Sequence, residues 1–518
     1  MARKTPFKAV RLSLADLLGV RYVDAVATAR AGLTGERTTA LRKLAEQKVN
    51  FYPRPFQQAL VDLLPKVGRR LGKPIRSSPR GASTRMFDAA AKTAMAPLTG
   101  WGYYRIAEDG RLYFLSKSEH YHAPLGHGFP GYRLMDLARR LGIPNATHNN
   151  TRGYITRRLE EELVRTANGL PRSDRPALDK VLRSRGGRAL NRVLNLQTGS
   201  LAAEAAVKLV LGRFYKAQDD SPTPKYAGRT PVLVVIGDDE GGAEANYHGT
   251  TLLAQVMRGM WPAIGRALDK QGLMKVVPVK ANDHDGLEAV FRKYDRGRYR
   301  IAGFFYEIVL MNYGGRRLTE RFVRRIHALC RKHDVPTVAD EIQSCLWSPE
   351  LYMFREYKVR PDVLVIGKGF PGGEYAASRI VFGAAMDCLP QFGALVTNGQ
   401  EELSSLAYLI TMRWAEANAA VTRAVGEDYE AKLRALVDKH PRHLAALEGR
   451  RHMASLYFHD LGKAKAFVKR LVAGGLDISV QTYKAACPPG ALTKLPLIAG
   501  FEAVDMVVGR MEEALRRL

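Results

Sequence analysis

Short apolar strands alternate with amphipathic helices along the middle of this chain of 518 residues. Strand-like runs such as "PVLVVIG", "IAGFFYEI", "VPTVAD" and "DVLVIGK" are separated by helical stretches such as "LAAEAAVKLVLGRFY" and "ERFVRRIHALCRKH". The alternation begins near residue 190 and continues to "ASRIVFG". This order of elements predicts an α/β domain with a parallel sheet covered by helices on both faces.

Ionisable residues stand where three of these apolar runs end. Glu307, Asp340 and Lys368 each follow a predicted strand. In parallel sheets, ligands bind beyond the carboxyl ends of the strands. A buried lysine must find an anion or lose its proton, and a buried carboxylate needs a cation. The three residues therefore predict a functional site at one edge of the sheet.

Pyridoxal 5′-phosphate (PLP) would satisfy both charges. A lysine of lowered pKa attacks its aldehyde to form a Schiff base, and an aspartate holds the protonated pyridine nitrogen. The segment "TGSLAAEAAVKL" opens a helix at Gly199 and Ser200, whose free amides and hydroxyl suit a phosphate. Each signal also fits a plainer structure, namely a structural ion pair or an ordinary helix cap.

The order of motifs resembles the class III (ω-) aminotransferases, which are PLP-dependent enzymes of fold type I. From about residue 96 to the end, the chain carries "PLGHGFP", "TGSLAAEAAVKL", "NYHGTT", "YEIVLMNYGG", "VADEIQS", "PDVLVIGKGFPGG" and "LPLIAGFEAVDMVVGRMEEAL" in that order. The resemblance implies a large domain whose mostly parallel seven-stranded sheet is flanked by helices. It also implies a smaller α+β domain built from the N-terminal segment and the C-terminus.

The resemblance assigns a role to each matching residue. Lys368 would be the internal-aldimine lysine and the proton carrier, and Asp340 would hold the pyridinium nitrogen. Gln343 would bind the phenolic oxygen of the cofactor, and Tyr247 would stack on its ring with His248 beside it. Gly199 and Ser200 would hold the phosphate, and Glu307 would lie near the aldimine and its substrate. Thr397 would reach the phosphate of a neighbouring subunit, which implies a homodimer with shared active sites.

The implied reaction moves an amino group from an amine or ω-amino acid donor to a 2-oxo acid or aldehyde. An aminomutase or a decarboxylase of the same fold is the alternative, because these enzymes share the cofactor residues. The arginine that often grips a substrate carboxylate is replaced by Leu492, with Lys494 two positions later. This departure weakens the expectation of 2-oxoglutarate as acceptor, although Lys494 could serve as a point charge.

Four segments are expected along the chain. Residues 1–95 are predicted to form a basic, mostly helical extension, and residues 96–190 an N-terminal segment of the smaller domain. The large PLP-binding domain is expected over residues 191–399, and the C-terminal part of the smaller domain over residues 400–518.

The net charge of +29 is unusual, and 19 basic residues stand against 6 acidic ones among the first 100. An anionic partner of the extension would explain this excess, but so would a solvated surface. A further alternative is a basic binding or assembly protein on an aminotransferase scaffold. The chain shows neither a secretory signal nor a membrane-spanning run, and its four cysteines form neither a disulfide framework nor a metal site. We therefore expect a cytoplasmic protein without a metal.

Overall fold

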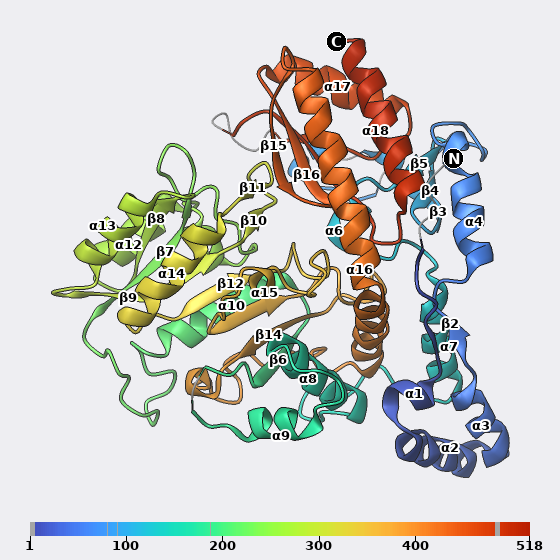
Figure 1. Cartoon of the computed structure of the whole chain (residues 1–518). Helices are drawn as coiled ribbons and strands as arrows, with labels where there is room; N and C mark the ends of the chain where they lie inside the picture. Colours follow the sequence, from blue (N-terminus) through green and yellow to red (C-terminus); the bar gives the residue numbers. More distant parts are fainter. Residues whose placement is uncertain (1–5, 80, 91, 187, 482–486) are drawn as a thin grey trace.

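The computed structural model describes residues 6–79, 81–90, 92–186, 188–481 and 487–518. A seven-stranded sheet in the order β6-β14-β13-β12-β9-β7-β8 forms the centre of the large domain (Figure 1). Its strands are β6 (Arg192–Leu196), β7 (Thr230–Gly237), β8 (Lys275–Lys280), β9 (Tyr299–Tyr306), β12 (Thr337–Asp340), β13 (Val363–Ile366) and β14 (Ser378–Phe382). Only β14 runs against its neighbours within this sheet. The predicted mostly parallel sheet is thereby confirmed.

Helices cover both faces of this sheet because alternate residues of its strands point in opposite directions. Val235 and Phe305 share an apolar cluster with helix α10 (Gly199–Leu211). The neighbouring Val234 and Phe304 belong to the cluster that contains α13 (His284–Tyr294) and α14 (Glu320–Lys332). Shorter helices complete the domain: α11 (Leu252–Met257), α12 (Pro262–Lys270) and α15 (Met353–Glu356), with the two-stranded ribbon β10 (Val309–Leu310) and β11 (Arg316–Arg317).

The N-terminal segment consists of helices followed by a small antiparallel sheet. Its helices are α1 (Leu14–Leu18), α2 (Val20–Thr34), α3 (Thr38–Glu46), α4 (Arg54–Asp62) and α5 (Arg85–Ala90), and β1 (Arg11–Leu12) pairs with β2 (Val49–Asn50). The sheet contains β3 (Pro97–Trp101), β4 (Tyr104–Ala107) and β5 (Leu112–Phe114), with a turn between β4 and β5. Then come α6 (Ser118–Tyr121), α7 (Arg133–Arg140), α8 (Tyr154–Ala167) and α9 (Arg175–Arg183).

The C-terminal part forms a four-stranded antiparallel sheet, in the order β15-β16-β18-β17, with three helices. Its elements are α16 (Glu402–Lys439), β15 (Leu444–Arg450), β16 (Met453–Phe458), α17 (Leu461–Ala473), β17 (Ser479–Gln481), β18 (Gly490–Lys494) and α18 (Phe501–Arg516). The amide of Phe114 donates to the carbonyl of Gly475 at 2.8 Å, and the amide of Asp477 donates to that of Phe114 at 3.0 Å. The N-terminal sheet and the C-terminus therefore form one smaller α+β domain, as expected.

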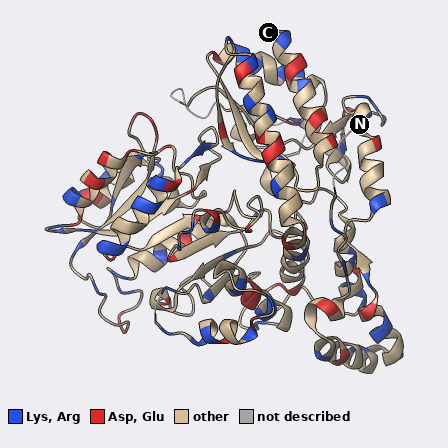
Figure 2. Ribbon diagram, viewed as in Figure 1, with Lys and Arg blue, Asp and Glu red and all other residues tan. Residues whose placement is uncertain are grey.

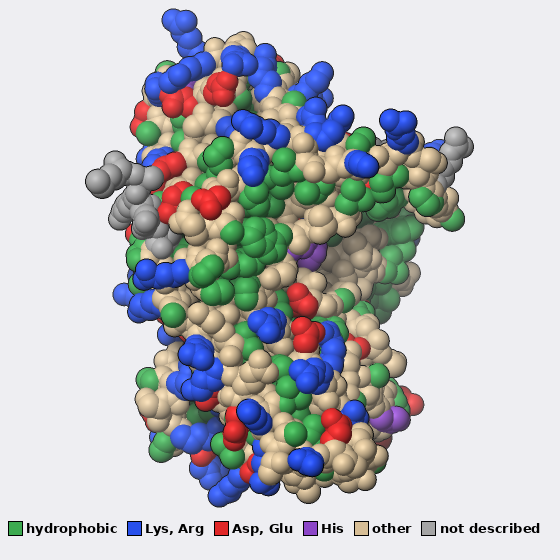
Figure 3. Space-filling model, turned by 90° about the vertical axis from the view of Figure 1, so that its right-hand side faces the viewer, with side chains coloured by type: hydrophobic (Ala, Val, Ile, Leu, Met, Phe, Trp, Pro, Cys, Tyr) green, Lys and Arg blue, Asp and Glu red, His purple; other side chains and the backbone are tan. Residues whose placement is uncertain are grey.

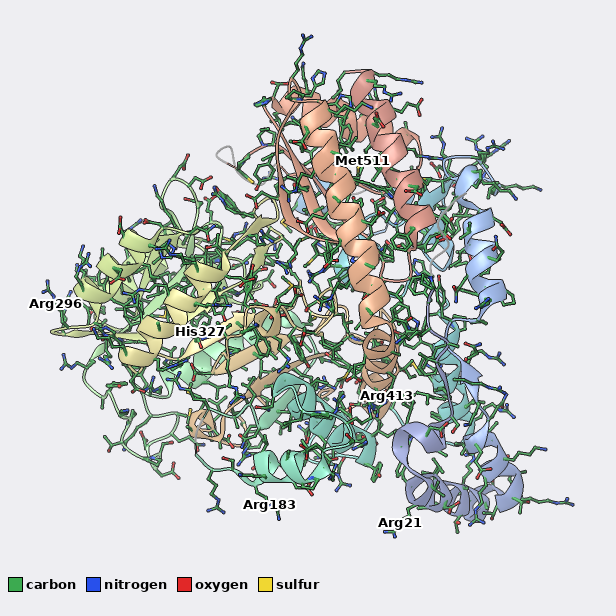
Figure 4. All side chains as sticks on the ribbon, in the orientation of Figure 1. Arg21, Arg183, Arg296, His327, Arg413 and Met511 are labelled. Carbon is green, nitrogen blue, oxygen red and sulfur yellow. The ribbon has the colours of Figure 1, made fainter. Side chains whose placement is uncertain are left out.

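Helix α16 extends through both domains (Figure 1). At its start, the buried carboxylate of Glu402 accepts hydrogen bonds from the amides of Ile155 and Thr156 and so caps α8. Farther along, Arg413, which is labelled in Figure 4, reaches Glu162 of α8 at 3.4 Å. Because α8 contacts β6 and β14 of the large sheet, these contacts fix α16 to the large domain at one end, while its other end packs on β15 and α18 of the smaller domain.

Two details differ from the sequence-based expectation. Strand β8 was not predicted, because Pro278 lies within it; a proline is tolerated there because β8 is an edge strand. The apolar residues of "GRRHMASLYFH" are typical of one strand, but the chain turns at Arg451, whose φ is +51°, and the run is divided between β15 and β16. No helix in the described part of the chain combines the length and apolar character needed to cross a bilayer.

Candidate active site

The three predicted ionisable residues meet at the carboxyl edge of the large sheet. Asp340 ends β12, Glu307 follows β9, and Lys368 follows β13 after Gly367. In the register of the sheet, Asp340 lies opposite Val365. Burial lowers the pKa of Lys368, and the nearby carboxylates of Glu307 and Asp340 oppose this shift. The amine therefore lies within the electrostatic reach of both carboxylates.

His248 fixes the side chain of Asp340. Nδ1 of His248 lies 2.6 Å from Oδ2 of Asp340, and Oδ1 of Asp340 accepts a hydrogen bond from the amide of Ile342 at 3.0 Å. Both side chains are buried. The carboxylate thus has one defined orientation, which the loop after β7 and the turn after β12 maintain.

Gln343 connects the other two residues. Its amide nitrogen donates to Oε2 of Glu307 at 3.0 Å, and its Oε1 lies 3.5 Å from Nζ of Lys368. Burial raises the pKa of Glu307 well above its usual value, and the charge of Asp340 adds to this effect. Among the described residues, Oε1 of Glu307 has no hydrogen-bond partner. The site therefore contains a buried carboxyl oxygen that is free to meet a ligand.

The backbone at Lys368 is unusual. Its φ is +39°, in a region that side chains with a Cβ rarely adopt. The thiol of Cys345 supports the preceding residue by donating to the carbonyl of Gly367 at 3.3 Å. Burial raises the pKa of this thiol to about 12, so Cys345 is a neutral structural group.

The helix start that was predicted to bind phosphate has a close neighbour. The amide of Thr250 donates to Oγ of Ser200 at 3.0 Å, and the two hydroxyl oxygens lie 3.2 Å apart. Gly249 has a φ of +109°, and a Cβ there would lie 2.6 Å from Cα of Ser200. Only glycine allows this approach, which brings the "HGT" loop against the first turn of α10.

Tyr247 and Thr397 are the remaining predicted residues. The ring of Tyr247 lies under the guanidinium of Arg258, with 4.9 Å from the ring centroid to Cζ. Thr397 is exposed on the loop between β14 and α16. In the described part of the chain, no hydrogen bond joins Thr397 to the residues around Lys368.

Sequence reasoning named Lys494 but missed the residues around it, Tyr121, Trp347 and Lys117. The ring of Tyr121 lies within 6 Å of the amines of Lys368, Lys494 and Lys117. Lys494 also lies 3.6 Å from the ring centroid of Trp347. Lys117 follows the apolar run "LYFLS" and so shows the same signal as Lys368, an ionisable residue after a buried strand.

These residues fit PLP in chemical type. The site provides a buried amine of lowered pKa, an oriented carboxylate, and a helix N-terminus whose approach is shaped by Gly249. Nε2 of His248 and Oε1 of Glu307 lack partners among the described residues. In that part of the chain, no group of His, Cys, Asp and Glu is arranged to hold a metal ion.

Comparison with known proteins gives a consistent result. The family model described as "Aminotransferase class-III" matches residues 131–489. The mitochondrial ornithine aminotransferase of Oryza sativa is 24% identical over 400 residues, which are 72% of this chain and 77% of the relative. The acetylornithine aminotransferase of Aquifex aeolicus is 23% identical, over 52% of this chain and 67% of the relative.

Solved structures share the fold. The ornithine aminotransferase of Toxoplasma gondii superposes with a TM-score of 0.65 at 17% identity. The matched part is 85% of this chain and 96% of the Toxoplasma chain. The adenosylmethionine-8-amino-7-oxononanoate aminotransferase of Methanocaldococcus jannaschii gives a TM-score of 0.64 at 16% identity, covering 85% and 97%.

Proposed function

Because this chain belongs to the class III aminotransferases, which are PLP-dependent enzymes, we propose that it transfers an amino group from an amine or ω-amino acid donor to a 2-oxo acid or aldehyde. Its cofactor is PLP, and its substrates are small amines and oxo compounds. Bound PLP supplies an electron sink that stabilises negative charge on the substrate carbon when a C–H bond breaks.

Lys368 is the residue that would hold the cofactor covalently. Burial favours the neutral amine, which is the nucleophilic form. Once released, Nζ of Lys368 would accept the proton that leaves the substrate carbon and later return it. The 3.5 Å contact with Gln343 and the nearby carboxyl of Glu307 would orient the amine for this transfer.

Asp340 would hold the positive charge of the ring nitrogen, with His248 as its positioning partner. Gln343 would bind the phenolic oxygen, and Tyr247 would cover one ring face. Gly199, Ser200 and the adjoining Thr250 would hold the phosphate at the start of α10.

The observation that carries this proposal is the meeting of Asp340, Glu307 and Lys368 at adjacent strand ends, with Gln343 between two of them. The test is the visible spectrum of the purified protein after PLP is supplied. We expect a visible absorption band, and we expect Lys368→Ala to lose both this band and amino transfer. A protein that takes up no PLP, or a K368A variant that transfers amino groups normally, would contradict the proposal.

A homodimer with shared active sites is also proposed. Thr397 lies on a loop that also carries Phe392, which is 78% exposed. Between residues 71 and 101, large apolar side chains are exposed as well: Leu71, Ile75, Met86, Phe87, Leu98 and Trp101. Figure 3 shows hydrophobic side chains gathered over the middle of one face. A partner subunit would cover such surfaces and bring its own Thr397 to the phosphate site.

The excess positive charge supports an anionic partner less strongly. Lys and Arg are spread over the helices of both domains, with acidic residues among them (Figure 2). An anionic partner of residues 1–95 stays a proposal, as does a cytoplasmic location, which the four free cysteines favour.

A further inference from the structure

Three lysine amines surround the ring of Tyr121. The distances from the ring centroid to Nζ are 4.7 Å for Lys494, 5.3 Å for Lys368 and 5.7 Å for Lys117. Lys368 has its task in the proposed reaction. Among the described residues, no carboxylate forms an ion pair with Lys117 or Lys494, although both lysines are buried. A buried lysine amine requires either an anionic ligand or other acceptors for the hydrogen bonds of its N–H groups.

The amine of Lys494 is already used by the protein. It donates to the backbone carbonyl of Gln343, and it lies 3.6 Å from the ring centroid of Trp347 and 4.7 Å from that of Tyr121. An ammonium group has only three donors, so these contacts enclose it. Burial lowers the pKa of Lys494 well below its usual value, and the nearby charge of Lys368 lowers this pKa further. Lys494 is thus suited to hold the backbone of Gln343, and not to receive a substrate.

The amine of Lys117 is different. Among the described residues, its Nζ donates a hydrogen bond to Oγ of Ser479 at 2.7 Å. Two of the three N–H donors of the ammonium group remain for a ligand. Asp477 is the nearby carboxylate, but its Oδ2 already contacts Arg105 at 3.3 Å. Burial lowers the pKa of Lys117 to about 8, Asp477 raises it, and Lys92 and Lys368 lower it. Lys117 is therefore largely protonated at neutral pH.

The backbone after Lys117 is held in a rare conformation. Residues 118 to 121 all have φ between +46° and +79°. Oγ of Ser118 donates to the carbonyl of Lys494 at 2.6 Å, and Glu119 contacts His127 at 2.9 Å. Strained backbone of this kind persists where its surroundings fix it, and it clusters at binding sites. Here it places the exposed His120 in a stack on Tyr121, with 4.7 Å between the ring centroids.

We propose that Lys117 recognises an anionic group at the non-reacting end of the substrate, whereas Lys494 is a positioning residue for Gln343. This inference rests on the proposed function, because it takes Lys368 as the reacting amine. The substrate class is an amino or oxo compound whose far end carries a carboxylate or a phosphonate. The sequence suggested Lys494 for this task; the contacts of the two amines favour Lys117 instead.

The test compares three donors of matched length with the PLP-loaded enzyme: 5-aminopentanoate, 4-aminobutylphosphonate and pentylamine. We expect the wild type to prefer the anionic donors in kcat/KM by about tenfold or more, since a hydrogen bond to a charged group is strong. Lys117→Gln should raise KM for the anionic donors by about tenfold and leave kcat/KM for pentylamine within about twofold. Lys117→Arg should restore most of the preference. The two anionic donors show whether carboxylate or phosphonate is preferred.

Two further variants separate the possible outcomes. Lys92 is exposed and lies close enough to Lys117 to influence its pKa. Lys92→Gln removes this nearby charge and should leave the ratios of kcat/KM between the three donors unchanged. Lys494→Gln should lower kcat for all three donors alike and shift the absorption maximum of the bound cofactor. Equal effects of Lys117→Gln on all donors, or a wild type that prefers pentylamine, would overturn the inference. Failure of the proposed function looks different, because no donor would then react and no cofactor band would form.

Discussion

Nδ1 of His248 and Oδ2 of Asp340 lie 2.6 Å apart at the carboxyl edge of the large sheet. The two residues come from different segments, 92 positions apart. This contact converts a buried carboxylate into an oriented one, so that it can meet a cation from one defined direction. Asp340 and His248 should therefore act as a unit.

Removing this charge should abolish most of the activity. We expect Asp340→Asn to lower kcat by at least about a hundredfold, within the range found for groups that stabilise charge during proton transfer. His248→Asn should cost about ten- to a hundredfold, since a hydrogen bond to a charged group contributes about 1.5–3 kcal/mol. Initial rates of amino transfer provide the measurement. A double variant that is no worse than Asp340→Asn would show that His248 acts through Asp340.

The rate at which the protein without cofactor takes up PLP should rise with pH. The neutral amine of Lys368 is the reactive form, and burial lowers its pKa from the usual 10.5. The rise should therefore be centred below pH 10.5. Glu307 raises this pKa, so Glu307→Gln should move the centre to lower pH. A stopped-flow series of the absorbance change checks both points. A shift to higher pH in E307Q would refute the assigned coupling.

Gly249 should be sensitive to even a methyl group. A Cβ there would lie 2.7 Å from Oγ of Ser200, at a φ of +109°. We expect Gly249→Ala to weaken PLP binding by about tenfold and to cost about 1–3 kcal/mol of stability. Titration with PLP and thermal unfolding measure these effects. Gly32, which has open space around it in α2, is the matched control; Gly32→Ala should be neutral or stabilise slightly.

Glu341 should make stability depend on pH. Its buried carboxyl accepts the amides of Met353 and Phe354 at 2.7 Å each, and burial raises its pKa to about 8. Between roughly pH 4.3, the usual value for Glu, and pH 8, the folded state binds more protons here than the unfolded state. This group's contribution to the unfolding free energy therefore decreases as pH rises through that window. Glu341→Gln should flatten the Tm profile, while costing about 1–3 kcal/mol through one unsatisfied amide. An unchanged slope would contradict the assignment.

Mixing impaired variants tests the proposed shared active site. Lys368→Ala and Thr397→Ala should each be impaired alone, because one lacks the amine and the other would lack the proposed phosphate contact across the interface. In a mixed dimer, one site has both residues intact. Equal mixing with free exchange should therefore recover about a quarter of the wild-type rate, since half of the dimers are mixed and each has one complete site. Sedimentation velocity should show the dimer. No recovery would place Thr397 in its own subunit's site or outside any site.

The sequence predicted the site best where an ionisable residue ends an apolar run. Asp340 and Lys368 could be identified because each breaks an apolar strand at its carboxyl end, and the sheet then brings such ends together. Gln343 and Tyr247 carried no such signal and depended on the family resemblance.

Other features could not be predicted from local pattern. The enclosure of Lys494 depends on Trp347, which is far away in the sequence. The full length of helix α16 is not evident from the sequence, because Gly426 weakens the helical pattern in its second half. The structure gives the reason for this glycine: a Cβ there would lie 2.6 Å from Cβ of Arg451, at the turn between β15 and β16.

The unbroken course of α16 has a mechanical consequence. At 1.5 Å per residue, its 38 residues form a rod of about 57 Å. A tilt of only about 5° at its Glu402 end would displace the opposite end by about 5 Å. Glu402 also accepts hydrogen bonds from the first turn of α8. A small shift of α8 near the large sheet would therefore produce a larger displacement of the smaller domain at the other end of α16.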